Sequence, residues 1–400
     1  MGRSVVYVGS ILEGGVAETF GIQNYSLAGE HKKRSVIRAM QSTGADVSVV
    51  APVQIAGSDV TAHRGGKHVD DDLDVPVHVP PSLGVFGLEF VILTLTTLFI
   101  TGRVAWRTDA DVVVFYNFKI QTTVPAFVGS WLASAALVVE YEDGMFVDPE
   151  TAGVIRKMAD WLRRGTGFAI DGGICASGPL ADILETDNTT VFRGFPSVGM
   201  PDELPERTDV SSPPTLMFSG RFDDVRGIDM FLDVIPEADR QVADVRFWVA
   251  GYGDEQTRKR VETRVESVAC DVTYFGTLPW EEYRTRVVDA DVLVNFQDPT
   301  LPISEYTFPS KLLDYMSAGT TVVSTDVGDV GTALGDELYV ANYDEQELAT
   351  AVVTCLTDNR TTRYGERARQ WIRTECDPVS VGERIATVFE RANERPKSHV

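Results

Sequence analysis

The sequence predicts an α/β protein of two doubly wound domains, each a parallel β-sheet covered by helices on both faces. Three observations support this. The chain has 400 residues, more than one hydrophobic core usually serves. Short apolar runs typical of buried parallel strands alternate with helical segments in both halves. Between the halves, residues 199–214 are charged, contain four prolines and lack periodicity, as expected of a linker.

The first half opens with a strand and then alternates between helices and strands. Residues 5–8 are expected to form a buried strand, and Gly14 and Gly15 lie in the loop after it. The elements expected next are a helix at 31–42 and strands at 46–50, 111–115 and 135–139. The polar stretch 57–74 contains Gly65-Gly66 and three consecutive aspartates, so it is predicted to be a surface loop.

Residues 85–100 are apolar enough to raise the question of a membrane span. A span needs roughly 20 apolar residues. Here Glu89 interrupts the run, and Arg103 and Arg107 follow it closely. We expect a helix within the first domain that does not cross a bilayer. Its remaining apolar face is a candidate surface for shallow, peripheral membrane contact.

The second half repeats the alternation without a short-period sequence repeat. Strands are expected at 215–218, 246–250, 272–275, 292–295 and 321–324, and helices at 228–235, 255–268, 280–288 and 310–317. The predicted domains are therefore residues 1–200 and 201–375.

The net charge is −23, and only 8 of the 36 basic residues are lysines. Such a surface is typical of proteins that fold in high salt, where screening weakens carboxylate repulsion. We therefore expect a salt-adapted source such as a halophilic archaeon; the alternative is an ordinary acidic protein. The charge disfavours nucleic acid and anionic lipid headgroups as partners. The four cysteines are scattered, which argues against zinc and disulfides and fits a reducing cytoplasm. The first apolar run is too short for a signal peptide core.

Candidate binding residues follow the strands of the second half, because ligands of parallel sheets bind beyond the carboxyl ends of the strands. Gly220 permits a tight turn after the first strand, and Arg221 and Arg226 come after it. Two guanidinium groups at this spacing can bind the oxygens of a diphosphate. The same arginines are also compatible with surface ion pairs to Asp223 and Asp224.

A second glycine loop follows the next strand. Gly251 and Gly253 flank Tyr252 there and allow a nucleotide to approach the backbone closely, although a plain turn uses the same residues.

The helix expected at 310–317 is a candidate anion site. It begins at Ser310, where backbone N–H groups and the helix dipole favour an anion. Lys311 adds a positive charge, and Asp314, one turn further, is placed to accept hydrogen bonds from ribose hydroxyls. The alternative is an ordinary amphipathic helix.

In this order, the motifs resemble the C-terminal half of retaining GT-B glycosyltransferases of group 1, or family 4. The resemblance covers residues 215–371. It rests on Gly220-Arg221, Gly251-x-Gly253, Phe275-Gly276 and the run F-P-S-K-L-L-D-Y-M-S-A-G at 308–319, which T-V-V-S-T-D-V-G follows. It implies the GT-B fold, in which two Rossmann-like αβα domains face a cleft. It also implies that the last helices, near 363–373 and 380–393, pack partly on the first domain, with residues 376–400 crossing back.

The resemblance assigns roles to several residues. Arg221 and Arg226 would bind the donor diphosphate, with Arg226 in place of the family's lysine. Asp314 matches the second of the family's two glutamates, which binds ribose, but has a shorter side chain. The first glutamate position falls on Tyr306 in strict register, and Glu305, one residue away, is the catalytic candidate.

The N-terminal half matches this family only loosely. Gly14 and Gly15 correspond to its glycine loop, while Tyr116 stands where a histidine often follows the strand. Glu142 and Asp143, after the strand at 135–139, are candidates to hold an acceptor hydroxyl; solvated carboxylates are the alternative.

The predicted function is transfer of a sugar, with retention, from a nucleoside-diphosphate sugar to a hydroxyl of a glycan or a lipid-linked sugar. Arg221, Arg226 and the helix start would stabilise the leaving diphosphate, which would itself take the acceptor's proton. No D-x-D motif follows a strand, so neither a metal nor another cofactor is expected. The alternatives are a sugar-nucleotide epimerase of the same fold and a catalytically inert subunit. We expect a cytoplasmic location, peripheral at the inner face of the membrane for a lipid-linked acceptor.

Overall fold

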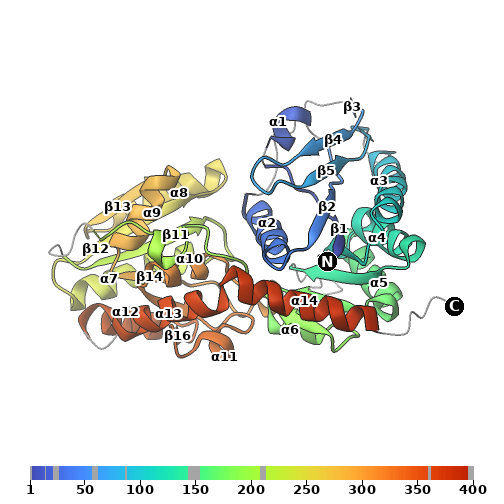
Figure 1. The fold of residues 1–400 in the computed structure, drawn as a ribbon. Coiled ribbons are helices and arrows are strands. Elements are labelled where there is room, and N and C mark those ends of the chain that lie inside the picture. The colour runs from blue at the N-terminus through green and yellow to red at the C-terminus, as the bar shows by residue number, and fades with distance from the viewer. Residues whose placement is uncertain are drawn as a thin grey trace. The chain divides into compact units, whose positions relative to one another are not determined.

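The computed structural model describes residues 2–13, 15–20, 27–55, 62–85, 88–142, 154–207, 213–358 and 362–394. The chain divides into two compact units (Figure 1). Unit 1 is Met1–Gly194 with Pro378–Val400, and unit 2 is Phe195–Asp377. Each unit has a parallel or mainly parallel sheet of its own, as the alternating pattern predicts.

Unit 1 is built on an 8-stranded sheet in the order β10-β9-β8-β7-β1-β2-β5-β4. The central strands β1 (Ser4–Val8), β7 (Val112–Tyr116) and β8 (Ala136–Tyr141) are parallel and almost entirely buried. Around them lie β2 (Asp46–Val50), β4 (Gly66–Val69), β5 (Pro76–Val79), β9 (Gly172–Cys175) and β10 (Thr189–Val191). The apolar runs of the first half are thus confirmed as buried parallel strands, with slightly shifted bounds.

Helices cover both faces of this sheet (Figure 1). On one side α3 (Leu88–Arg107) packs against α4 (Ile120–Ala133), and α5 (Val154–Thr166) contacts α4. On the other, α2 (Leu27–Ser42) packs against α14 (Pro378–Glu394), which also contacts β8 and β9. The short helices are α1 (Val16–Phe20), η1 (Gly167–Ala169) and α6 (Gly178–Asp182).

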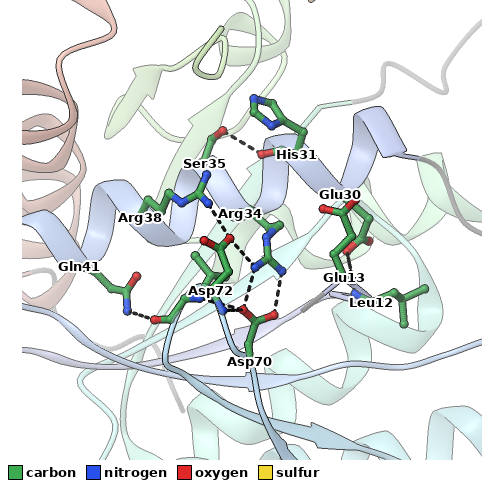
Figure 2. Close-up of polar contacts among 11 residues, drawn as sticks. Leu12, Glu13, Glu30, His31, Arg34, Ser35, Arg38, Gln41, Asp70 and Asp72 are labelled. Atoms are coloured by element: carbon green, nitrogen blue, oxygen red, sulfur yellow. Dashed lines mark hydrogen bonds and ion pairs between the residues drawn. The ribbon is translucent and has the colours of Figure 1, made fainter. Parts of the chain in front are cut away.

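The polar stretch 57–74 differs from the predicted surface loop. Residues 57–61 lie outside the described part, but the remainder contains β3 (Ala62–His63), paired with β6 (Ser82–Leu83), and β4, which pairs antiparallel with β5. Arg34 of α2 donates to both carboxylate oxygens of the buried Asp70 at 2.7 Å (Figure 2). Arg34 and Arg38 also bind Asp72 (Figure 2). The loop prediction is wrong here because these partners come from a distant helix, which local composition does not reveal.

Helix α3 extends further along the chain than the predicted helix at 85–100. Its buried face packs on α4, where Thr101 lies so close to Gly129 that a Cβ there would be 2.8 Å from Thr101 Cγ2. Among the described residues, it is the one helix long and apolar enough to cross a membrane. In its most apolar stretch of 18 residues, 39% is buried inside the protein. The helix is therefore part of the layer that covers the sheet, and it has a second, exposed apolar face.

Unit 2 is built on a 6-stranded parallel sheet in the order β13-β12-β11-β14-β15-β16. The strands are β11 (Thr215–Arg221), β12 (Arg246–Tyr252), β13 (Val272–Gly276), β14 (Val292–Asn295), β15 (Thr321–Thr325) and β16 (Tyr339–Ala341). Leu216 and Phe218 pack into one core and Met217 into another, because successive strand residues point to opposite faces. The strands predicted for the second half are confirmed; β16 was not predicted.

Helices also cover both faces of the second sheet. Residues of α7 (Ile228–Gln241) and α12 (Glu345–Thr357) form one core with the strands, and residues of α9 (Trp280–Asp289), α10 (Lys311–Ala318) and α13 (Thr362–Glu375) form the other. The remaining helices are η2 (Pro201–Glu203), α8 (Glu255–Ser267), η3 (Pro302–Glu305) and α11 (Val330–Leu334). Of the two last helices, α13 packs against α10 in unit 2, and α14 belongs to unit 1.

Candidate functional site

The loops at the carboxyl ends of β11 and β12 lie side by side in unit 2. Gly220 pairs with Gly251 across these strands, and both have positive φ angles, 141° and 156°. A Cβ at Gly251 would collide with the carbonyl oxygen of Gly220. These glycines therefore bring two stretches of backbone closer than other residues allow. Tyr252 is exposed at the end of β12, and Gly253 follows it.

Lys311 lies near Gly220, and Arg226 lies close enough to Lys311 to act on its charge. An Asx turn, in which Asp223 Oδ1 accepts the N–H groups of Val225 and Arg226 at 3.1 and 2.8 Å, positions Arg226. Its Nε is buried without a hydrogen-bond partner among the described residues. Lys311 Nζ lies 3.4 Å from Ser219 O and 4.8 Å from the centre of the Phe218 ring.

The electrostatics of this pair are unfavourable without an anion. Burial and the positive charge of Arg226 lower the pKa of Lys311 to about 7, while Asp223 acts in the opposite direction. Arg221 is exposed, and its Nε lies 3.5 Å from Asp223 Oδ2. The structure thus brings Arg226 and Lys311 together and places the third predicted cation, Arg221, beside Asp223, whose carboxylate is near all of them. Such a cluster suits a multiply charged anion.

Helix α10 begins at this cluster. Ser310 precedes its first residue and is exposed, and Gly319 ends it with a φ of 67°. Tyr315, one turn after Lys311, is fully buried, and its hydroxyl lies 2.7 Å from Ser219 Oγ. This contact fixes the start of α10 against the end of β11. The dipole of α10 adds to the positive potential there.

Asp314 is buried in a different set of contacts from those the sequence suggests. Its carboxylate accepts the Ser197 N–H at 2.6 Å, the Ser197 hydroxyl at 2.7 Å and the Val198 N–H at 3.1 Å. The Tyr283 hydroxyl also donates to it, at 3.4 Å. Asp314 therefore anchors residues 197–198 to α10. A ribose contact at this side chain stays a prediction, and it requires a ribose hydroxyl to share or replace these donors.

Glu305 is exposed at the end of η3, on a loop that a buried polar network supports. Gln297 Nε2 donates to Ser304 Oγ at 3.0 Å, and Ser304 Oγ donates to the Asp298 carbonyl at 2.6 Å. Asn295 reaches Ser324 of β15 at 2.9 Å. Sequence reasoning missed this network. The available signal was the two amide side chains, Asn295 and Gln297, at the carboxyl end of a buried strand.

In unit 1, the loop after β1 is held by α2. Glu30 accepts the Leu12 N–H at 2.7 Å and pairs with Lys33 at 2.5 Å. Gly15, with a φ of 84°, lies beside His68: a Cβ there would be 3.1 Å from His68 Nε2. Gly14 lies outside the described residues.

A cluster of tyrosines, glutamates and lysines lies at the carboxyl ends of β1, β7 and β8. Tyr7 donates to Glu140 at 2.6 Å and Tyr116 to Glu142 at 2.7 Å, while Lys32 pairs with Glu142 at 3.5 Å. Asp143, the other predicted acceptor residue, lies outside the described residues.

Glu140 is the most unusual member of this cluster, and the sequence did not single it out. It is buried, and its Oε1 has no hydrogen-bond partner within the described parts of the chain. Burial and the charge of Glu142 raise its pKa to about 8. Strongly perturbed carboxyl groups at strand ends are candidates for functional sites.

No group of three or more His, Cys, Asp or Glu side chains that could hold a metal ion occurs among the residues that the structure describes.

Comparisons with known proteins match part of the chain to a known family. Residues 213–358 match the family model of glycosyl transferases group 1. Over 128 residues, the chain is 30% identical to one of the subunits of phosphatidylinositol N-acetylglucosaminyltransferase from Arabidopsis thaliana. This match covers 32% of the chain and 27% of the plant protein, so the chain spans about a quarter of that relative's length.

Solved structures match along nearly the whole chain. Anabaena HepE in complex with UDP and glucose has a TM-score of 0.67 at 14% identity, covering 96% of this chain and 98% of that one. The catalytic domain of starch synthase IV from Arabidopsis thaliana has a TM-score of 0.66 at 11% identity, covering 99% and 100%. Sucrose-phosphate synthase from Thermosynechococcus elongatus has a TM-score of 0.66 at 13% identity, covering 97% and 98%. The fold is therefore GT-B.

Proposed function

We propose that this chain is a glycosyltransferase that binds a nucleoside-diphosphate sugar in unit 2. The observation that carries the proposal is the half-buried pair of Arg226 and Lys311, with Lys311 beside Gly220. Two neighbouring cations repel each other, and a diphosphate between them would turn that repulsion into attraction. The match of residues 213–358 to group 1 glycosyl transferases supports this, because it includes both residues.

The reaction we propose is transfer with retention. The bond from the anomeric carbon to the diphosphate oxygen breaks, and a bond to the acceptor oxygen forms on the same face of the sugar. The acceptor's proton moves to the leaving diphosphate. Arg221, Arg226 and Lys311 stabilise the negative charge that develops on the diphosphate, so the chain need not supply a nucleophile. Glu305 is the proposed group near the sugar.

For the acceptor, we propose a hydroxyl of a lipid-linked sugar or inositol, held in unit 1 near Glu142 and Asp143. The plant relative's name includes phosphatidylinositol, which supports a lipid acceptor. It also includes N-acetylglucosamine, so a donor carrying that sugar is among those to be tested. Glu140 is proposed to position the acceptor, because its protonated carboxyl group can donate a hydrogen bond. We propose a cytoplasmic location at the inner face of the membrane.

A donor panel tests the function. The purified chain, in high salt, is mixed with UDP-, ADP- and GDP-sugars, including UDP-glucose and UDP-N-acetylglucosamine, and ligand binding is read from the rise in melting temperature. Donors that bind are then incubated with inositol phospholipid or glycolipid acceptors. Nucleoside diphosphate release with a new glycolipid supports transfer. Inversion at the sugar's second carbon would support an epimerase instead, and binding without any turnover would support an inert subunit.

A further inference from the structure

We propose that the exposed face of α3, together with a basic groove beside it, docks on the surface of an anionic phospholipid bilayer. The exposed face is an apolar stripe made of Leu88, Val91, Leu95, Phe99 and Trp106, which are between 49% and 70% exposed. These residues recur at intervals of three, four or seven, so they lie along one side of the helix. A helix of 20 residues is about 30 Å long.

The stripe lies next to further apolar surface from α4. Leu132 and Trp131 are exposed at the end of α4. Leu132 Cδ1 lies 2.9 Å from where a Cβ of Gly102 would be, so Leu132 packs directly on α3. The apolar surface is therefore contiguous over two helices, which is larger than the scattered apolar residues of an ordinary soluble surface.

Carboxylates avoid this surface, although the chain has 59 of them in 400 residues. The one acidic residue of α3, Glu89, is buried, and it accepts the Ile55 N–H and the Ser82 hydroxyl instead of facing solvent. The net charge of −23 disfavours anionic lipids for the chain as a whole, but this surface does not share that charge.

A groove of about 510 Å³ separates α3 from the strands β4 and β5. Phe99, Ile100 and Val104 line it, and Arg64, Lys67, Arg103 and Arg107 contribute four basic side chains. None of the described residues lining the groove is acidic. Arginine and lysine at this position suit lipid phosphates, while the apolar lining suits the upper part of an acyl chain.

These features together favour a bilayer over a second copy of this chain. In a two-fold dimer through this face, the basic groove would lie against the same groove of the second copy, and like charges repel, whereas an anionic bilayer offers the opposite sign. Helices with a long apolar stripe, flanking arginines and an exposed tryptophan lie in the interface of membranes with the apolar side chains in the acyl boundary. Since the opposite face of α3 packs on α4, the helix can dock without crossing the bilayer.

Vesicle flotation of the full chain tests the docking. We compare vesicles of phosphatidylglycerol with phosphatidylcholine against vesicles of phosphatidylcholine alone, without any donor, at about 0.1 M and about 1 M KCl. The native chain should float with the anionic vesicles about tenfold more strongly than with the neutral ones at low salt. At high salt the anionic preference should shrink while apolar binding persists.

Variants separate the two contributions. Leu95→Ser with Phe99→Ser should weaken binding to both vesicle types about tenfold or more. Arg103→Gln with Arg107→Gln should remove the anionic preference only. Trp280→Ser, at an exposed tryptophan of unit 2, is the matched control and should bind as the native chain does. Unchanged circular dichroism and melting temperature verify that each variant is folded.

The proposal would be overturned by no flotation of the native chain with either vesicle, by α3 variants that float like the native chain, or by a native dimer in solution that Leu95→Ser with Phe99→Ser dissociates. Release of vesicle-bound chain by detergent but not by alkaline wash would also overturn it, since that indicates a spanning helix. The docking rests on the proposed membrane location, but none of these results depends on donor binding, so failure here leaves the proposed sugar transfer standing.

Discussion

At the scale of single residues, the surroundings of four side chains should affect ligand binding and stability measurably. These are Arg226, Lys311, Asp314 and Glu140. Each is a charged or ionisable group that is buried or half-buried, so its protonation state and its partners decide what it can bind. Arg226 and Lys311 lie near one carboxylate, that of Asp223, while Asp314 accepts from several donors, and one oxygen of Glu140 has no hydrogen-bond partner among the described residues. A group with few partners is a candidate to bind a ligand, whereas a group with several partners, such as Asp314, has a structural role.

Donor binding should depend on pH through Lys311. Its pKa is lowered to about 7 in the free protein, and a diphosphate beside it would raise that pKa again. Binding above pH 7 must therefore take up a proton, and affinity for the nucleoside diphosphate should fall by up to about tenfold per pH unit between pH 7 and 9. Calorimetry in two buffers of different ionisation enthalpy measures the uptake. Lys311→Met should abolish it; equal uptake in that variant would contradict the assignment.

Replacing Asp314 by Asn should reduce stability. An amide group accepts at only one of its two ends, so at least one of the donors from Ser197, Val198 and Tyr283 would lose its acceptor. We expect a loss of about 1–3 kcal/mol in the free energy of unfolding, measured with urea. Ser197→Ala in the Asp314→Asn background should add little, because both changes remove one shared interaction.

A nucleotide analogue tests the ribose role of Asp314 separately. If this carboxylate contacts the ribose, a 2′,3′-dideoxy nucleotide should lose affinity with the native protein and little more with Asp314→Asn. Additive losses would show that Asp314 serves residues 197–198 alone.

Glu140 should make stability decrease as pH rises. Its pKa in the folded protein is raised to about 8 from 4.5, so the folded state keeps a proton that the unfolded state releases. The stabilisation is complete below about pH 4.5 and is lost as pH rises toward 8. Unfolding of Glu140→Gln should depend less on pH between 5 and 8 than unfolding of the native chain. Identical slopes would show that Glu140 is ionised throughout this range.

At the scale of elements, the loop that carries Glu305 depends on buried groups behind it. Ser304 both accepts from Gln297 and donates to the Asp298 carbonyl. Its hydroxyl therefore fixes how the chain turns from β14 toward α10, with Glu305 as the next residue.

Ser304→Ala should disturb the position of Glu305 without removing a charge. We expect turnover to fall about tenfold, with a smaller change in donor affinity, because misplacement acts mainly on the reacting geometry. Ser267→Ala, at the exposed end of α8, is the control. Equal donor affinity and equal turnover in both variants would refute the positioning role.

Some elements of the fold could be predicted from the sequence, and others could not. Strands such as β1, β7 and β11 were predictable because buried parallel strands are continuous apolar runs with turns after them. The glycine turns at Gly220 and Gly251 were predictable for the same local reason. The ion pair of Arg34 with Asp70 and the partners of Asp314 were not, because these contacts join residues 36 and 117 positions apart. Local patterns do not encode such distant hydrogen bonds.

At the scale of the whole molecule, the two units carry different polar groups at the carboxyl ends of their strands. Unit 2 presents cations, through Arg221, Arg226 and Lys311, while unit 1 presents the carboxyl groups Glu140 and Glu142 among tyrosines and lysines. This division fits a donor that is a diphosphate and an acceptor that is a hydroxyl. The net charge of the chain is −23, so a cluster of cations such as the one in unit 2 stands against the overall charge.

The most direct test of the central claim is turnover of Arg226 variants with a donor that the native chain uses. Arg226→Ala should lower kcat at least about tenfold with a smaller change in KM, because the charge on the leaving diphosphate is greatest in the transition state. Arg226→Lys should recover part of the loss, and Arg240→Ala, an exposed arginine paired with Glu237, should leave turnover unchanged. Native turnover in both Arg226→Ala and Arg221→Ala would contradict the account.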